Sequence, residues 1–250
     1  MMRAPLLFSL LAAVVCLTTA PPARADAGAT FAAANSAYAA GHFAEAIKGY
    51  EALVEGQHWS ANVFYDLGNA YFRAGDPGRA ILNYERALAL NPAQPEAQAN
   101  LRLVRDQARA LELAPSWPET HLDFLTANQF AILAAVALWG AAFLLAAILF
   151  SRSRPVAWIF GFVLLLAIGG GSVFAVTAFE TGKNGGDLAI VTAAKVQARL
   201  ATAENAGTVL VLPPGSEIRV LSTRGQWSYA ALPNDLRGWI PAKSAERVRL

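Results

Sequence analysis

Few residues of this chain are of the types that carry out covalent or metal chemistry. The sequence holds one cysteine, Cys16, and three histidines, His42, His58 and His121, which lie far apart. A single cysteine forms neither an intramolecular disulfide nor a cysteine-based zinc site. No stretch has the spacing of a zinc-protease helix, a nucleophile elbow or a phosphate-binding loop. We therefore predict that the protein is not an enzyme and has no catalytic residue, no metal site and no cofactor.

The composition favours a membrane protein over a soluble enzyme. Hydrophobic residues make up 55% of the 250 residues and charged residues only 15%, whereas soluble domains are usually about a quarter charged. The formal net charge is +2, which lacks the large basic excess typical of proteins that bind nucleic acid. Membrane-spanning segments are therefore expected.

Candidate binding residues lie in a repeat near the N-terminus. The motif is Phe64-x-x-Leu67-Gly68-x-x-Tyr71, followed by Gly75, Ala80, Tyr84, Ala87 and Pro92. The pattern recurs 34 residues earlier, where Asn35, Gly41, Ala46 and Tyr50 precede Asn69, Gly75, Ala80 and Tyr84. This spacing resembles the tetratricopeptide repeat family, with Phe64 in place of the usual tryptophan. The resemblance implies stacked helix pairs over residues 26–114, about two and a half units.

Small residues explain why the repeat pattern folds. Ala46 and Ala80 must be small where paired helices cross, and Gly68 admits a neighbouring side chain. The first unit is degenerate because Ala33 and Ala34 replace the Leu-Gly pair. A third helix is predicted from near Pro95 to about Leu113. A single unit cannot bury its apolar stripe alone, so the units must stack.

The tetratricopeptide resemblance also implies a concave groove lined by the first helix of each unit. Asparagines there would bond a peptide backbone, and an arginine would meet a carboxylate. The alternative is that the aromatic side chains only pack between adjacent helices. The candidate ligand-binding residues are Phe31, Asn35, Tyr38, Tyr65, Asn69, Phe72 and Arg73.

The first 25 residues are predicted to be a signal peptide. Arg3 precedes an apolar run from Leu6 to Leu17, and Ala23-x-Ala25 fits the small-x-small cleavage rule. The run is too short for a stable span. An uncleaved anchor is the minority alternative. Lipidation of Cys16 is disfavoured because bulky Val15 precedes it.

Two uncharged stretches predict transmembrane helices at residues 128–150 and 156–179. The turn between them, residues 151–155, carries Arg152 and Arg154, so the positive-inside rule places it in the cytoplasm. Both large flanking regions then face outward from the bacterial inner (cytoplasmic) membrane. Gly169 to Gly171 is expected to interrupt the second helix. Small residues such as Ala137 and Ala141 favour packing of the two spans on each other, with a docking face for another membrane protein as the alternative.

Residues 187–250 follow a glycine-rich linker at 182–186 and have the pattern of short strands and turns. The stretches Pro214-Gly215-Ser216-Glu217-Ile218, Gly225-x-Trp227 and Gly238-Trp239-Ile240-Pro241 resemble bacterial SH3-like domains. That family often binds cell-wall peptides or protein ligands. Candidate contacts are Arg199, Trp227, Tyr229 and Trp239, and the alternative is that Trp227 and Trp239 fill the barrel.

The predicted fold class is a multidomain membrane protein with an α-helical repeat array, two transmembrane helices and a C-terminal all-β SH3-like barrel. This order of modules resembles the BatE-like tetratricopeptide-SH3 proteins of bacterial aerotolerance (Bat) operons. The resemblance implies a non-catalytic adaptor that works with von Willebrand factor A-domain membrane proteins and, indirectly, a MoxR-type ATPase. Two alternatives remain open. One is a peptidoglycan sensor or tether acting through the SH3-like domain, and the other is an accessory subunit that holds a wall-modifying enzyme nearby.

Overall fold

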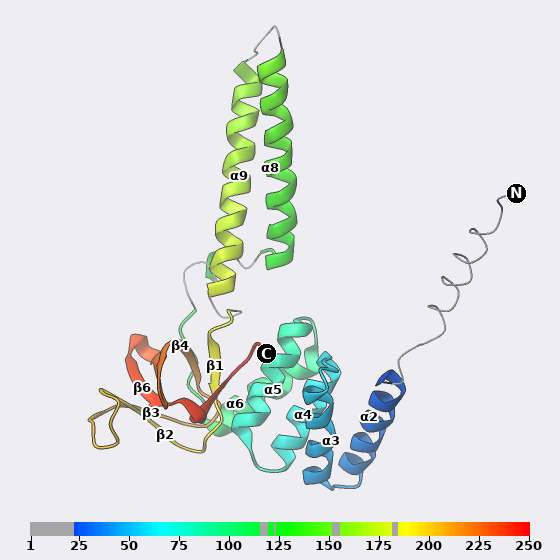
Figure 1. Ribbon diagram of the computed structural model, residues 1–250, viewed down its shortest axis with the longest axis vertical. Helices are drawn as coiled ribbons and strands as arrows, with labels where there is room; N and C mark the ends of the chain where they lie inside the picture. The colour runs from blue at the N-terminus through cyan, green and yellow to red at the C-terminus, as the bar shows by residue number, and fades with distance from the viewer. Residues whose placement is uncertain (1–22, 116–119, 123, 152–155, 182–184) are drawn as a thin grey trace, which may run out of the picture.

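The computed structural model describes residues 23–115, 120–122, 124–151, 156–181 and 185–250. Within them, five helices come first, two long apolar helices follow, and a seven-stranded antiparallel sheet ends the chain (Figure 1). This order confirms the predicted fold class. Most of the predicted signal peptide, residues 152–155 of the predicted cytoplasmic turn with both its arginines, and Gly182 to Asn184 of the linker lie outside the described residues.

The five repeat helices have local signals at their ends. A serine side chain caps α4, where Ser60 Oγ accepts from the N–H of Val63. Asp76 caps α5 in the same way, and Pro77 occupies its first turn. Gly41 and Gly75 have φ of +81° and +83° in equivalent turns, where glycine is favoured. The helices are α2 (Ala23–Ala39), α3 (Phe43–Glu55), α4 (Ala61–Arg73), α5 (Pro77–Leu90) and α6 (Pro95–Ala108).

Close helix contacts are made by different residues in the two repeats. A Cβ on Gly68 of α4 would lie 2.8 Å from the ring of Tyr84 on α5. The equivalent of Gly68 in the first unit is Ala34, and there Gly49 on the facing helix supplies the space: its Cβ would lie 2.8 Å from that of Ala34. In the degenerate first repeat, the glycine that allows close packing therefore lies on the second helix of the pair, α3, and not on the first.

Helix α6 ends earlier than the sequence suggested. The prediction that it reaches Leu113 is wrong, because Arg109 adopts a left-handed conformation with φ of 51° after Ala108. The following residues run beside the sheet instead. The N–H of Glu217 donates to the carbonyl of Leu111 at 2.8 Å, and the N–H of Leu113 donates to the Glu217 carboxylate at 3.1 Å.

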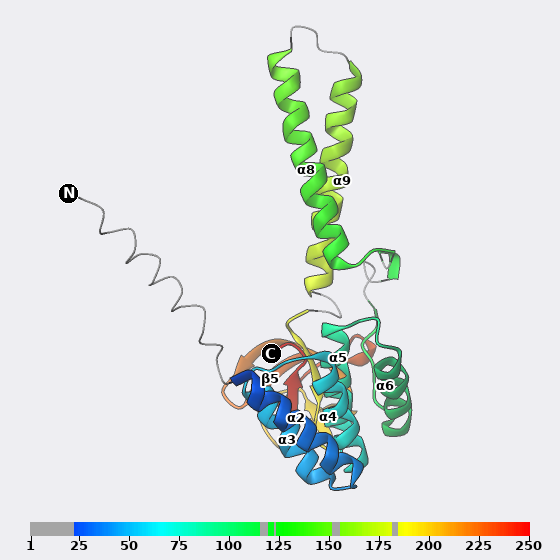
Figure 2. The ribbon, with the colours of Figure 1, turned by 90° about the vertical axis from the view of Figure 1, so that its right-hand side faces the viewer.

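The two apolar helices α8 (Ala127–Phe150) and α9 (Val156–Thr181) form a hairpin, with the repeats and the sheet at the same end (Figures 1 and 2). Ala137 and Ala141 are both 2% exposed, which supports packing of the two helices on each other. The expected interruption at Gly169 is wrong. Helix α9 runs unbroken through this residue, where a Cβ would lie 2.8 Å from the Leu138 side chain.

The C-terminal strands form one antiparallel sheet. Its order is β3-β2-β6-β5-β4-β1-β7. Alternate side chains of each strand fill an aliphatic core that includes Ala198, Ile218 and Ile240. The strands are β1 (Leu188–Val191), β2 (Val196–Arg199), β3 (Thr208–Leu212), β4 (Glu217–Arg224), β5 (Trp227–Ala231), β6 (Arg237–Pro241) and β7 (Ala245–Arg247).

Strand β1 joins the sheet to the repeats. All four of its residues are buried, because both of its faces are covered. Ala189 and Val191 face the sheet core, whereas Leu188 and Ile190 belong to the core of the repeat helices. The backbones also come close, since a Cβ on Gly78 of α5 would lie 2.9 Å from the carbonyl oxygen of Val191. The repeats and the sheet therefore share one continuous packed interface.

A buried cluster of charges lies in this interface. The guanidinium of Arg105 on α6 binds Glu85 of α5 at 2.5 Å and also binds Glu217 of β4. The three side chains are 9%, 11% and 1% exposed. A second arginine, Arg86, donates to the carbonyl of Arg247 at 3.0 Å. The repeats and the sheet are held together by ion pairs as well as by apolar contact.

We predict that Arg105→Ala lowers the free energy of unfolding by about 3–5 kcal/mol, because it removes the buried cation that Glu85 and Glu217 share. The measurement is chemical denaturation of the full chain in detergent micelles, followed by tryptophan emission. The control is Arg247→Ala, which removes an exposed ion pair with Asp187 at 3.7 Å and should cost less than about 1 kcal/mol. Equal losses in the two variants would contradict the importance of the buried cluster.

Candidate functional site

The predicted groove residues lie on helices α2 and α4, whose surface is continued by α6. Asn100 of α6 donates to Asn69 at 2.9 Å and to the hydroxyl of Tyr65 at 3.3 Å, and α2 contacts α4 directly. We call this surface the first-helix face. It comprises Phe31, Asn35 and Tyr38 of α2, Tyr65, Asp66, Asn69 and Phe72 of α4, and Asn100 of α6.

The two asparagines of the first-helix face are held by buried tyrosines. The hydroxyl of Tyr50 donates to Asn35 Oδ1 at 2.6 Å, and that of Tyr84 donates to Asn69 Oδ1 at 2.7 Å. The two bonds are equivalent, since each member is displaced by one 34-residue repeat. Each amide oxygen is thereby occupied within the protein. What an asparagine here offers a ligand is the amide nitrogen, a hydrogen-bond donor.

The aromatic candidates also contribute to folding. Phe31, Tyr38, Tyr65 and Phe72 are all partly buried and pack against the core of the repeats. The Phe31 ring lies 6.0 Å from that of Tyr50, and the Tyr65 ring lies 6.0 Å from that of Tyr84, between centroids. Packing between helices, the alternative interpretation of these residues, therefore accounts for much of their buried surface.

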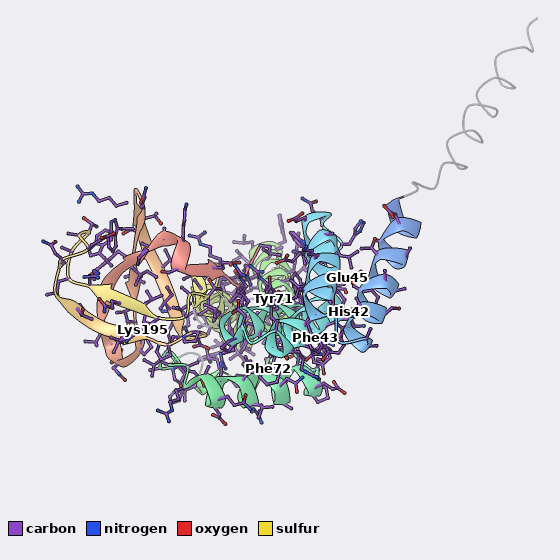
Figure 3. The ribbon with its side chains drawn as sticks, turned by 90° about the horizontal axis from the view of Figure 1, so that it is seen from below. His42, Phe43, Glu45, Tyr71, Phe72 and Lys195 are labelled. Atoms are coloured by element: carbon purple, nitrogen blue, oxygen red, sulfur yellow. The ribbon has the colours of Figure 1, made fainter. Side chains whose placement is uncertain are left out.

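Arg73 lies at the C-terminal end of α4 and is exposed. Its guanidinium carbon is 4.8 Å from the centroid of the Phe43 ring, within the range of a cation–π contact. Tyr38 meets the same ring edge-on at 5.5 Å. Figure 3 shows Phe43 and Phe72 in this end of the repeats. Arg73 is thus placed by an aromatic ring from α3 and remains open to solvent.

The candidates of the C-terminal sheet lie on its outer surface. Tyr229 and Trp239 face each other across β5 and β6 with ring centroids 5.0 Å apart, and Arg199 pairs with Trp239. Trp227 and Trp239 are half-buried and alternate with buried residues. The interpretation that these tryptophans fill the barrel is wrong, because small and aliphatic side chains occupy the core.

Arg199 also has a structural partner. Its guanidinium donates to the carbonyl of Ala206 and to Gln197 Oε1, both at 3.0 Å. It therefore braces the loop between β2 and β3, where the sequence departs from the SH3-like pattern. The aromatic pair beside it, Tyr229 and Trp239, presents flat surface to solvent from two neighbouring strands.

Comparison with known proteins bears on the repeat helices. Residues 61–94 match the tetratricopeptide repeat family. The match covers α4, α5 and the turn after them, and the fold of this segment agrees with it. No curated protein matches the chain. Among the described residues, no three histidine, cysteine, aspartate or glutamate side chains are grouped so as to hold a metal ion.

One residue of the first-helix face was missed from the sequence. Asp66 lies in the middle of α4, beside Tyr65, and is half-buried. Its side chain forms no hydrogen bond and no ion pair with the described part of the chain. Burial raises the pKa of its carboxyl group from 3.8 to about 6. The signal available in the sequence was an acidic residue one turn before Asn69 on a groove-lining helix.

Asp66 influences the tyrosines around it. The pKa of Tyr50 rises to about 12, through burial first and the charge of Asp66 second. The pKa of Tyr84 is also raised, mainly by burial, with smaller contributions from Tyr65, Tyr38 and Asp66. These couplings place Asp66 near Tyr50 of α3 and Tyr84 of α5. Partial burial, and no neighbouring cation, determines the pKa of its carboxyl group.

We predict that Asp66→Asn stabilises the protein at neutral pH. The folded pKa of about 6 lies above the ordinary 3.8, so the folded chain binds its proton more tightly than the unfolded chain. As pH rises from about 4 to about 6 the unfolded chain gives up this proton first, and stability falls. The variant removes this loss, which is worth about 1–3 kcal/mol.

The measurement is chemical denaturation of the full chain at pH 7.5 and at pH 4. Asp66→Asn should raise the free energy of unfolding at pH 7.5 and change it by less than about 0.5 kcal/mol at pH 4. The matched control is Asp187→Asn, since Asp187 is 64% exposed and should respond little at either pH. An equal effect of Asp66→Asn at both pH values would contradict the assignment.

Proposed function

We propose that the protein is a non-catalytic scaffold that uses its repeat helices to bind protein partners. The observation that carries this proposal is the tetratricopeptide repeat at residues 61–94, a type of module that binds peptide segments. The sheet packs on α5 and the end of α6 and leaves Asn35 of the first-helix face exposed, together with Ala32, which follows Phe31 on α2. A partner segment therefore has access to this face.

We further propose that the hairpin anchors the scaffold in a bacterial inner membrane. Both helices are long and apolar enough to span, and only 17% of each apolar window is buried within the protein. Phe150, Phe160 and Trp139 are 91%, 72% and 67% exposed, which favours a lipid surrounding over water. Arg152 and Arg154 favour a cytoplasmic turn, so the repeats and the sheet would face the extracytoplasmic side.

The order of modules supports a BatE-like role. A predicted signal peptide, a tetratricopeptide repeat, two apolar helices and a C-terminal β domain stand in the order of that family. By this resemblance the partners are von Willebrand factor A-domain membrane proteins, with a MoxR-type ATPase acting indirectly. The C-terminal domain would then be SH3-like and would serve as a second interaction module.

A second function is favoured by one feature of the sheet. Tyr229 and Trp239 stack on the outer surface beside Arg199, and Trp227 lies on the same side of β5. Flat aromatic surface with a cation suits a ligand that has both apolar and anionic parts. The alternative proposal is therefore a peptidoglycan sensor or tether acting through this sheet.

The first test locates the partner surface. A photoreactive amino acid at Ala32, which is exposed on α2, should crosslink to a membrane protein in the native membrane. The same residue at Lys48, exposed on α3, should not form that product. The products are captured in mild detergent and identified by mass spectrometry. Crosslinks from Lys48 alone, or wall fragments captured in place of proteins, would contradict binding of a protein at the first-helix face.

The second test concerns orientation. In a Cys16→Ser background, Ser222→Cys on β4 and Ser151→Cys at the far end of α8 report on the two sides of the membrane. We expect a membrane-impermeant thiol reagent to label position 222 in cells whose outer barrier is opened. Position 151 should react only after the inner membrane is permeabilised. The reverse pattern would overturn the proposed orientation.

A further inference from the structure

The desolvated carboxylate of Asp66 points to the kind of segment that the repeats bind. We propose that Asp66 receives the positively charged side chain of a lysine or arginine in an extended partner segment that lies across the first-helix face. This inference rests on the proposed function and names the chemistry of its ligand. It differs from the carboxylate recognition that Arg73 suggested in the sequence.

The first argument is the contrast between Asp66 and the other buried acids. Glu85 and Glu217 bind Arg105, and half-buried Glu51 accepts from the hydroxyl of Tyr71. Each therefore has a donor that offsets the loss of water. Asp66 is half-buried in the same array, yet nothing in the described residues donates to it. Its carboxylate oxygens can therefore accept from a donor that a ligand supplies.

The second argument is that the two tyrosines whose pKa values respond to the charge of Asp66 do not donate to it. The hydroxyls of Tyr50 and Tyr84 donate to Asn35 and Asn69 instead. Asp66 lies in the middle of α4, away from the N-terminal turn where backbone N–H groups are free. Its environment raises its pKa through loss of water, with no cation acting against it.

The third argument concerns the shape of the ligand. The charge of Asp66 acts on Tyr50 of α3 and Tyr84 of α5, so aromatic side chains of two helices lie near it. A cation beside aromatic rings gains cation–π attraction in addition to its charge-assisted hydrogen bond. Asn35 is exposed, and because its Oδ1 is held by Tyr50, its Nδ2 remains a donor for a peptide carbonyl. Tyr50, which binds Asn35, also feels the charge of Asp66, so a peptide bonded at Asn35 would have a long basic side chain within reach of Asp66.

The test uses the full chain in detergent micelles and arrays of acetylated, amidated nine-residue peptides. Their flanking positions are equimolar mixtures, and the central residue is lysine, arginine, norleucine, citrulline or glutamate. We expect the wild type to retain the lysine and arginine peptides about tenfold more than the norleucine and citrulline peptides, which is the effect of one charge-assisted hydrogen bond. Asp66→Asn should abolish this preference, and Asp187→Asn should keep it.

Each outcome decides something different. Because Asp66→Asn should stabilise the fold at neutral pH, a lost preference in that variant reflects lost recognition and not unfolding. A basic preference that survives in Asp66→Asn would overturn the assignment of the site. Retention of all peptides without a basic preference would overturn the cation inference and leave peptide binding standing. Retention of none by the wild type would count against the proposed peptide-binding function itself.

Discussion

The arrangement of the molecule depends on one guanidinium. Arg105 is shared by Glu85 of the repeats and Glu217 of the sheet, and all three side chains are nearly out of water. Taking ions out of water costs several kcal/mol each, and only close, well-directed pairing offsets this. Such a cluster tolerates little displacement of α6 relative to β4. The repeats and the sheet are thus one body, in which Leu188 and Ile190 of β1, together with Val248 after β7, complete a core made mainly by helices.

This shared body gives the hairpin its place in the fold. The apolar helices are inserted in the chain between α6 and β1, and those two elements belong to the same packed unit. Both ends of the hairpin must therefore return to one place, as Figures 1 and 2 show. If α8 and α9 cross a membrane, the repeats and the sheet lie on the same side of it for a packing reason. The positive-inside rule, applied to Arg152 and Arg154, also places the repeats and the sheet on one side of the membrane. It does so without using the packing between them.

Local patterns in the sequence were sufficient for the elements but not for their assembly. The 34-residue displacement of Tyr50 and Tyr84 predicted the repeats, and period-two alternation predicted the strands, since both follow from near-neighbour geometry. The ion pair between Arg105 and Glu217 joins positions 112 apart in the chain, and no periodicity reports it. The exchange between Gly68 and Gly49 was also hidden, because a small residue serves equally well on either of two facing helices. For Trp227 and Trp239 the residue type suggested a core, yet strand alternation put them outside.

Asp66 was overlooked for a related reason, because an aspartate on a helix is usually a solvated residue. Its significance comes from what surrounds it, since Tyr50 and Tyr84 lie near it but donate their hydroxyls to Asn35 and Asn69. The fold pairs Glu85 and Glu217 with Arg105, but it provides no donor for Asp66, and this lowers the stability of the folded state. Exceptions of this kind in an otherwise consistent structure are expected at functional sites. In the proposed site the tyrosine–asparagine bonds and the carboxylate have separate roles. The bonds fix the amide donors that a peptide backbone meets, and the carboxylate selects the charge of a side chain.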